Sequence, residues 1–219
     1  MGSVVLDVSM SLDGFITGPN VGVELPLGEG GVRLHDWMAN PDPEHHGDWH
    51  QTGASEVDAK VKQTAVATTG AIVMGRRSFD VGIGPWGDTP YPVPCFVVTH
   101  QPQKDLDMRS GTFTFVTDGI EAALEQARAA AGARDVCLMG ADIAQQFLSA
   151  GLLDELHLHL APVLIGAGTR LFDHLHLDAG RIELERTGLI DSPDVTHLRF
   201  RIVKTEAEFW HVKLQEHLS

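Results

Sequence analysis

The chain has 219 residues, which suits one α/β domain, and 43% of them are hydrophobic, enough to build a buried core. Its 16 basic and 30 acidic residues give a formal net charge of -14 at pH 7. Such a charge repels phosphate backbones, so we predict no nucleic-acid partner.

No apolar stretch reaches the roughly 18 residues of a membrane span, so we expect no membrane partner. The N-terminus lacks a basic segment followed by an apolar run, so we also expect no signal peptide. Cys95 and Cys137 lie in apolar runs, as buried free thiols do in a reducing compartment. Together these features favour a cytoplasmic location.

Apolar patterning predicts strands that alternate with helices and then close on a run of strands. This order indicates a mainly parallel sheet with an antiparallel edge. Asp118 is the expected cap of the helix that follows it, and Ser55 with Asp58 resembles a capping box. The expected strands are 4–8, 71–74, 95–99, 112–116, 136–139 and 156–160, then a hairpin of 182–189 with 197–203; the expected helices are 34–38, 55–67, 120–131 and 142–150; the expected loops are 20–50 and 80–94.

We predict one domain over residues 1–204 and a tail over residues 205–219. The tail fits a strand through Trp210, Val212 and Leu214, or one helix face through Trp210, Leu214 and Leu218. Either arrangement presents an apolar face, so we expect the tail to pack on the domain or on a second subunit.

Two segments, 71–79 and 136–148, share one pattern: a buried strand runs into Met-Gly and a helix follows. A helix N-terminus offers free N–H groups and a positive dipole end, which suits phosphate. The pair indicates a dinucleotide held by two loops at one edge of the sheet. Two ordinary strand–helix turns would give the same pattern.

Histidines gather in two places. His45, His46, Asp48 and His50 have the side chains of metal ligands but lack a rigid helical spacing, so we interpret them as a solvated loop and expect no metal. His157 and His159 should point to one face of a strand, where they could contact a ligand or a metal, line a polar face, or lie at a subunit interface.

Several motifs together resemble the dihydrofolate reductase-like proteins, in particular the C-terminal reductase domain of riboflavin biosynthesis proteins. The resemblance implies a three-layer α/β/α fold, NADPH-linked reduction of a small molecule, and pairing into a homodimer. The motifs are Ser11-Leu-Asp-Gly-Phe-Ile16, Val73-Met-Gly-Arg-Arg-Ser-Phe-Asp80, Phe96-Val-Val-Thr99, Gly151-Leu-Leu-Asp-Glu-Leu156 and Ala161-Pro-Val-Leu-Ile-Gly-Ala-Gly-Thr-Arg-Leu-Phe172.

The same resemblance assigns cofactor-binding residues in three places. The sequence departs from its relatives at Gly140, where they usually carry two adjacent glycines, and the Cβ of Ala141 restricts the approach of phosphate. Asp142 would then cap the helix and place negative charge where phosphate should lie. The assigned residues are Gly75, Arg76, Arg77 and Ser78 in the first loop, Thr99 and His100 at a strand end, and Met139, Gly140, Ala141, Asp142 and Ile143 in the second loop.

For the substrate, the resemblance favours Asp36 beside Trp37 as the catalytic carboxylate, although a solvated helix position would look the same. Asp13 is a second candidate, and a turn-stabilising aspartate is its alternative. Phe15 and Trp86 offer aromatic rings that could stack on a flat ligand or pack on the body of the protein.

The function that these features favour is NADPH-dependent reduction of a small heteroaromatic compound, pterin-like or pyrimidine-like, by hydride transfer. One alternative is a non-catalytic nucleotide-binding protein on the same fold, which the missing glycine favours. The other is a reductase that uses a flavin-type cofactor.

Overall fold

The computed structural model describes residues 1–38, 54–88, 91–175 and 182–203. The predicted tail and the histidines of residues 45–50 lie outside these ranges. The strands are β1 (Val4–Ser11), β2 (Phe15–Thr17), β3 (Thr69–Gly75), β4 (Cys95–Val98), β5 (Leu106–Asp107), β6 (Thr112–Val116), β7 (Asp135–Met139), β8 (Glu155–Ala161), β9 (Thr169–Arg170), β10 (Glu183–Ser192) and β11 (Val195–Val203). The helices are η1 (Gly31–Met38, a 3-10 helix), α1 (Glu56–Thr68), α2 (Arg76–Trp86), α3 (Gly119–Ala131) and α4 (Ala141–Ser149).

Nine of the described strands form one sheet in the order β10-β11-β8-β1-β7-β3-β4-β6-β5. The central strands β8-β1-β7-β3-β4-β6 run parallel to one another. The hairpin β10–β11 adds antiparallel to β8 at one edge, and β5 adds antiparallel to β6 at the other. The predicted mainly parallel sheet with an antiparallel C-terminal hairpin is confirmed.

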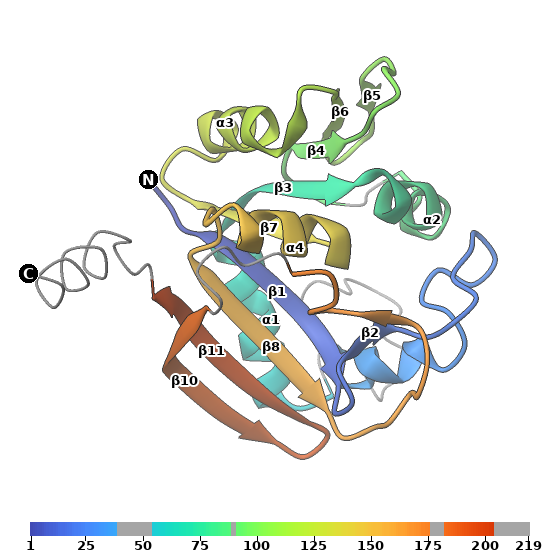
Figure 1. Ribbon diagram of the computed structural model, residues 1–219, viewed down its shortest axis with the longest axis vertical. Coiled ribbons are helices and arrows are strands. Elements are labelled where there is room, and N and C mark those ends of the chain that lie inside the picture. The colour runs from blue at the N-terminus through green and yellow to red at the C-terminus, as the bar shows by residue number, and fades with distance from the viewer. Residues whose placement is uncertain (39–53, 89–90, 176–181, 204–219) are drawn as a thin grey trace, which may run out of the picture.

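The helices cover both faces of the sheet, which gives three layers (Figure 1). Helices α3 and α4 bury an apolar stripe, including Leu124 and Phe147, against β1, β3, β7 and β8. On the other face, α2 packs Phe79 against β3 and β4, while η1 packs Trp37 and α1 packs Val61 near Val195. The three-layer α/β/α arrangement is therefore confirmed.

Strand alternation makes the two faces of the centre of the sheet chemically different. On β1, Val4 and Leu6 enter the apolar core under α3 and α4. The odd-numbered residues of β1 point to the other face of the sheet, where Asp7 and Ser9 lie among polar side chains. A polar sheet face under α1 and η1 is the feature of the fold that positions the site.

Helix α2 corrects the loop predicted for residues 80–94, because it runs to Trp86 with Pro85 in its last turn. The Trp86 ring folds back over Gly82, where a Cβ would lie 2.3 Å from the ring. It also packs parallel to the Phe113 ring at 6.3 Å. Tertiary packing of one aromatic ring thus extends a helix through a sequence rich in glycine and proline.

Two predicted helix starts also need correction. Helix α4 begins at Ala141 with Gly140 as its N-cap, so Asp142 lies inside the first turn and does not cap. Asp118 occupies the N-cap position of α3, but its side chain makes no capping bond. The Ser55 cap is confirmed, since its Oγ accepts a hydrogen bond from the Asp58 N–H at 3.2 Å.

In the described part of the chain, no helix is both long enough and apolar enough to cross a membrane. Cys95 and Cys137 are both free thiols, as predicted. Burial raises the pKa of each to about 12, so neither is a thiolate at neutral pH.

Candidate active site

A cavity of about 1640 Å³ opens at the carboxyl ends of the parallel strands, on the side of the sheet that α1, α2 and η1 cover. Ligands of open α/β sheets bind at this edge, because the loops and helix N-termini that follow the strands meet there. The lining has two chemically distinct ends. One end is formed by the starts of α2 and α4, and the other by β1, β8 and η1.

At the first end, the loops after β3 and β7 come together. Neither Gly75, the N-cap of α2, nor Gly140, the N-cap of α4, provides a side-chain cap. The first N–H groups of both helices therefore have no side-chain acceptor at the cap position, and both helix starts line the cavity. A phosphate group would satisfy such donors.

Glycine is required at position 140 for two reasons. Its φ of +98° disfavours any side chain. A Cβ there would also lie 2.6 Å from the Ser78 Oγ atom. The N-cap of α4 therefore lies against the Ser78 side chain in the first turn of α2, and the two helix starts together form a cradle that the single glycine makes possible. The residues present fit a dinucleotide phosphate.

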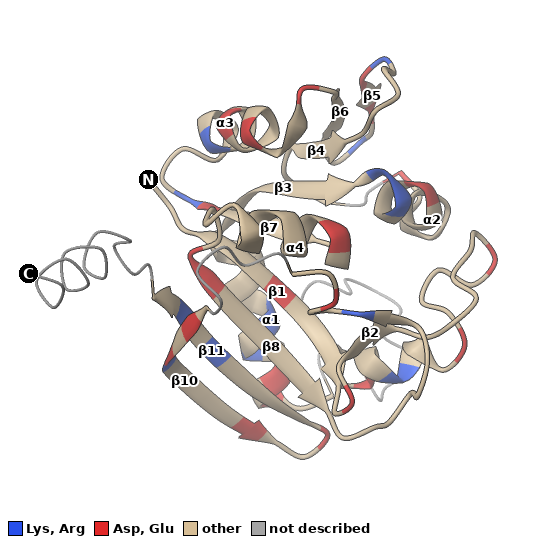
Figure 2. Ribbon diagram, viewed as in Figure 1, with Lys and Arg blue, Asp and Glu red and all other residues tan. Residues whose placement is uncertain are grey.

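The two arginines that the sequence assigned to the cofactor differ in their ion pairing. Figure 2 shows basic residues at the start of α2 and an acidic residue at the start of α4. The Arg76 Nε atom is already paired with Asp80 at 2.7 Å. Arg77 is exposed and makes no ion pair with any residue that the structure describes, so it is the cation available to a ligand.

The remaining residues assigned to the cofactor also line the cavity. Thr99 and His100 follow the end of β4, and the Thr99 Oγ1 atom accepts a hydrogen bond from the Gln101 N–H at 3.1 Å. Ala141 is buried and Asp142 is exposed. All eleven residues assigned to the cofactor line the cavity: Gly75, Arg76, Arg77, Ser78, Thr99, His100, Met139, Gly140, Ala141, Asp142 and Ile143.

The residues predicted for the substrate do not all meet there. Trp37 and Trp86 line the cavity. Asp36 is not among the lining residues; its side chain is 50% exposed and pairs with Arg33 at 2.8 Å. Its catalytic role stays a prediction that the geometry does not favour.

Asp13 and Phe15 are likewise not among the residues that line the cavity. The Asp13 carboxylate accepts hydrogen bonds from the Ile165 and Gly166 N–H groups at 3.1 and 2.7 Å. A hydrogen bond from Ser11, together with these backbone bonds, lowers the pKa of Asp13 to about 2. The Phe15 ring lies under the Arg170 guanidinium at 4.2 Å. Asp13 thus holds the turn after β1 against the loop before β9, and Phe15 packs β2 against β9.

The second end of the cavity contains His159, which the sequence analysis named as a possible ligand contact, and four residues that it did not assign to a site. Asp7, Ser9, His35, Lys62 and His159 line it beside Trp37. The Trp37 Nε1–H donates to the Ser9 Oγ atom at 2.9 Å, and its ring lies 4.4 Å from the His159 ring.

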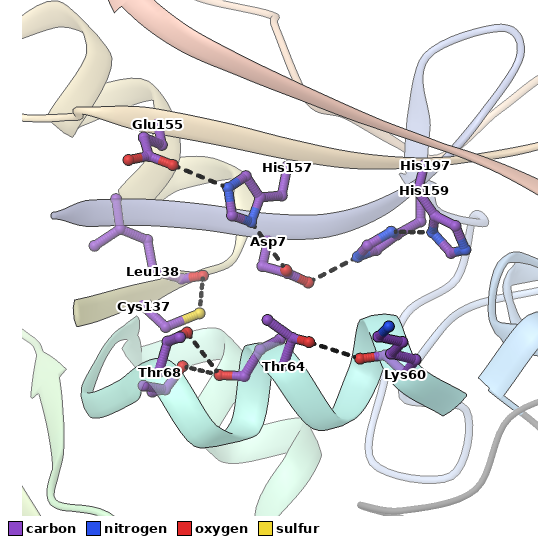
Figure 3. A network of polar contacts seen from close by, with 12 residues as sticks. Asp7, Lys60, Thr64, Thr68, Cys137, Leu138, Glu155, His157, His159 and His197 are labelled. Atoms are coloured by element: carbon purple, nitrogen blue, oxygen red, sulfur yellow. Dashed lines mark hydrogen bonds and ion pairs between the residues drawn. The ribbon is translucent and has the colours of Figure 1, made fainter. Parts of the chain in front are cut away.

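Behind this end, polar side chains from three strands form a connected network (Figure 3). Asp7 contacts the His159 Nε2 atom at 2.8 Å and the His157 Nδ1 atom at 3.4 Å. The His159 Nδ1 atom lies 2.7 Å from the Nδ1 atom of His197. The His197 Nε2 atom in turn lies 3.0 Å from an Asp58 carboxylate oxygen on α1.

These contacts shift the pKa values of the network. Burial alone would raise the pKa of Asp7, but attraction to His159 and hydrogen bonds with both neighbouring histidines lower it below its usual range. Burial would likewise raise the pKa of Asp58, and hydrogen bonds from Ser192, Ser55 and His197 lower it. Both carboxyl groups are therefore ionised at neutral pH.

The histidines respond in opposite directions. Burial lowers the pKa of His197 by more than its hydrogen bond to Asp58 raises it. Burial would also lower the pKa of His157, but the hydrogen bond and attraction from Asp7 raise it.

Strand alternation was the signal that could have found this network. Asp7 and Ser9 alternate with apolar residues on β1, as do His157 and His159 on β8. The prediction that His157 and His159 share one face is confirmed, since both contact Asp7. Neither His197 nor Asp58 could be joined to them without the strand order. Among the described residues, no group of three His, Cys, Asp or Glu side chains could hold a metal ion.

The arrangement of sheet, paired loops and cavity defines a dihydrofolate reductase-like α/β protein, the fold shared by its structural neighbours. The chain belongs to the RibD C-terminal domain family, whose model matches residues 3–198. This is a family of reductases, and it implies a nicotinamide cofactor in general terms. A comparison with curated proteins found no match.

Solved structures share the fold at low sequence identity. A putative riboflavin biosynthesis protein from Shewanella sp. PV-4 has a TM-score of 0.65 and 19% identity over 92% of this chain and 99% of its own. A pyrimidine reductase-like protein from Corynebacterium diphtheriae has a TM-score of 0.56 and 14% identity over 93% of both chains. Acinetobacter baumannii RibD has a TM-score of 0.56 and 17% identity over 93% of this chain and 59% of its own.

Proposed function

We propose that this protein is an NADPH-dependent reductase of a small pyrimidine-like or pterin-like compound. The observation that carries the proposal is the pair of helix starts without side-chain caps, α2 after Gly75 and α4 after Gly140, at one end of the cavity. When bound, the nicotinamide cofactor would supply a hydride. Membership in a reductase family supports the same reading.

In this proposal the two ends of the cavity have different roles. The loops at Ser78 and Gly140 hold the pyrophosphate through backbone N–H groups. Arg77 supplies the charge that distinguishes NADPH from NADH, since it is the unpaired cation of the α2 start within the described structure.

The polar end next to Trp37 takes the substrate. Trp86 lines the cavity and offers a face for a flat heterocycle, whereas Trp37 is buried and packs against His159 in the cavity wall. Asp7 replaces Asp36 as the proposed acidic residue at the substrate, because Asp7 lines the cavity and Asp36 does not. A ring with N–H groups would hydrogen-bond to this carboxylate.

We further propose a homodimer. Strand β10 is the outermost strand of the sheet, so one of its backbone edges has no partner among the described strands. Leu184, Leu189 and Ile190 on this strand are exposed. A second copy of the chain would cover them. We also keep a cytoplasmic location as a proposal, supported by the two free cysteines.

Titration of the purified protein with NADPH, followed by nicotinamide fluorescence, tests the cofactor assignment. We expect saturable binding that is tighter than for NADH. Oxidation of NADPH in the presence of pterins and aminopyrimidinones then tests the reaction. Binding without turnover would favour the non-catalytic alternative, and failure to bind either nicotinamide nucleotide would overturn the proposal and favour a flavin-type cofactor.

A further inference from the structure

Four side chains form a continuous chain of hydrogen bonds from the cavity into the protein. Asp7 and His159 line the cavity, whereas His197 and Asp58 lie behind them. His159 and His197 are each 3% exposed and Asp58 is fully buried. We call Asp7, His159, His197 and Asp58 the proton cluster. Its members come from β1, β8, β11 and α1, so only the folded protein assembles it. Figure 3 shows the contacts that join Asp7, His159 and His197.

The number of protons in the cluster follows from its geometry. Three hydrogen bonds join Asp7 to His159, His159 to His197, and His197 to Asp58. Each bond needs one proton, and carboxylates bring none. Two neutral imidazoles carry two protons between them. The cluster therefore holds one proton more than two neutral histidines would, shared along a buried path between two carboxylates.

The surrounding charges agree with this count. Lys62 on α1 is 5% exposed and its Nζ atom donates to the Met38 carbonyl at 3.3 Å. Two carboxylates, one shared imidazolium charge and the Lys62 ammonium balance to zero, which a buried site favours. The other titratable or charged groups that face the cluster are His35 on η1, His157 and Glu155 on β8, and Arg199 on β11.

The end of the cluster away from the cavity leads toward the surface. The Ser55 Oγ–H donates to the second Asp58 carboxylate oxygen at 2.7 Å. Ser55 lies 3.2 Å from the Ser192 hydroxyl in the hairpin β10–β11. Both serines are half-buried, so the Asp58 end of the cluster is connected to partly exposed hydroxyl groups.

We propose that the proton cluster stores the proton consumed in the reduction and that Asp7 delivers it to the substrate. This rests on the proposed reductase function. The Asp7 end of the cluster lines the cavity, so a proton that moves along the cluster reaches the substrate there. Asp58 is a positioning residue, because it holds the charge of the pair without reaching the cavity.

The step balances as follows. A hydride adds two electrons to the carbon of a substrate C=N bond, whose nitrogen becomes a strong base. The ionised Asp7 carboxylate first takes the Nε2 proton of His159 and then gives that proton to the substrate nitrogen, so Asp7 is ionised again at the end of the step. One N–H bond forms on the substrate and one breaks on His159, and the cluster is left with two protons. A proton from water then restores it through the Asp58 end.

The proton count is tested without substrate, by nitrogen NMR of protein labelled at the histidine rings. At about pH 6–8, the range around neutrality in which an ordinary histidine loses its charge, we expect three N–H groups on the four ring nitrogens of His159 and His197. In Asp58→Asn the extra proton should be lost at a pH lower by about 1–3 units, the usual effect of one neighbouring charge. Asp7→Asn should also lower the pH at which the extra proton is lost, and this variant replaces Asp58→Asn in the test if Asp58→Asn does not fold.

Asp88→Asn, at an exposed aspartate paired with Arg109, is the matched control and should leave the histidine titration unchanged. Two protons on the four nitrogens of the wild type, or an unchanged titration in both cluster variants, would overturn the proposal.

Turnover of dihydropterin with NADPH tests delivery. We expect Asp7→Asn to lower kcat by about 10²–10⁴-fold, the usual contribution of a general acid, with unchanged NADPH affinity. Asp58→Asn should move the alkaline limb of the kcat profile to lower pH by the same shift as the NMR titration. Equal profiles for Asp58→Asn and wild type would refute delivery from the cluster. If the wild type oxidises no NADPH, the proposed function fails, and the NMR titration still decides the proton count.

Discussion

Gly140 approaches Ser78 so closely that a Cβ on the glycine would lie 2.6 Å from the serine Oγ. This contact joins the N-cap of α4, which follows β7, to the first turn of α2, which follows β3. Within the described structure it is the point where the two proposed phosphate loops meet.

The first prediction concerns this contact. Gly140→Ala should destabilise the protein by about 1–2 kcal/mol through its positive φ, and it should weaken NADPH binding as well, because the added Cβ displaces the Ser78 hydroxyl at the cradle. Adding Ser78→Ala should restore part of the binding, and a double-mutant cycle measured by calorimetry gives the coupling.

Gly132→Ala is the control for Gly140→Ala. Gly132 also has a positive φ, of 65°, but a Cβ there meets nothing within 4 Å. It ends α3, and it is not among the residues that line the cavity. The Gly132→Ala variant should be less stable than the wild type and should bind NADPH with unchanged affinity. Equal effects of the two substitutions on binding would show that the Ser78 contact is unimportant.

The second prediction distinguishes the two arginines. Arg77→Ala should weaken NADPH binding by about 1.5–3 kcal/mol, as expected for lost hydrogen bonds to a charged group, and should affect NADH less. Arg76→Ala should have a smaller effect, because Arg76 is paired with Asp80. Fluorescence titration with both nucleotides measures this. Equal affinities of the wild type for NADPH and NADH would contradict the assignment.

The third prediction separates binding from stability at Asp142. This exposed carboxylate lies in the first turn of α4, where it stabilises the helix dipole and repels a phosphate. Asp142→Asn should therefore tighten NADPH binding and lower the free energy of unfolding by about 0.3–1 kcal/mol. Calorimetry and urea unfolding measure the two effects. Weaker binding in the variant would show that the carboxylate assists the ligand.

The fourth prediction is a pH dependence of stability that originates at His35. Burial lowers the pKa of His35, with a hydrogen bond to Gly31 opposing it. The unfolded chain, in which this pKa is about 6.5, then binds more protons than the folded chain. The stabilisation is complete above that pH and is lost as the pH falls through the lower folded pKa.

Urea unfolding of wild type and His35→Gln at several pH values tests this. As the pH falls, the free energy of unfolding of the wild type should decrease relative to that of His35→Gln. His157→Gln is the opposite control, since the pKa of His157 is raised. The stabilisation from His157 should be present at low pH and lost as the pH rises through its folded pKa. Differences that do not depend on pH would contradict both assignments.

The fifth prediction concerns the exposed strand β10. Light scattering should report about twice the 23.7 kDa mass of one chain. Leu189→Lys, on β10 and 53% exposed, should shift the protein toward the monomer. Leu164→Lys is the control, because that leucine is 73% exposed but lies outside β10. A mass of one chain over a wide concentration range would refute the dimer.

The periodicity of the sequence was sufficient for much of the fold. Apolar runs such as those of β3 and β7 read as buried strands because parallel strands are covered on both faces. The Met-Gly pairs after them predicted two helix starts, and both loops line one cavity. The extent of helix α2 was missed, because glycine and proline dominate local propensity after residue 80 and the packing of Trp86 on Phe113 joins residues far apart in the chain.

The substrate end shows the limit more clearly. Asp36 was chosen from its neighbour Trp37, yet the two side chains of η1 point to different environments, one exposed and one buried against His159. Asp7 and Asp58 are separated by a long stretch of chain and looked like ordinary acidic residues. Only the strand order β11-β8-β1 and the position of α1 brought them to the two histidines.

The sequence by itself thus determined the type and order of the main elements, because side-chain periodicity is a local property of helices and strands, but it did not predict the short strands β2, β5 and β9. It also indicated the two Met-Gly turns, of which Gly140 has the positive φ that favours glycine, whereas the φ of Gly75 is -79°. The tertiary structure alone decided which ionisable groups share protons. Proton sharing depends on distances of about 3 Å between residues far apart in the chain, and these distances are set by register and helix packing.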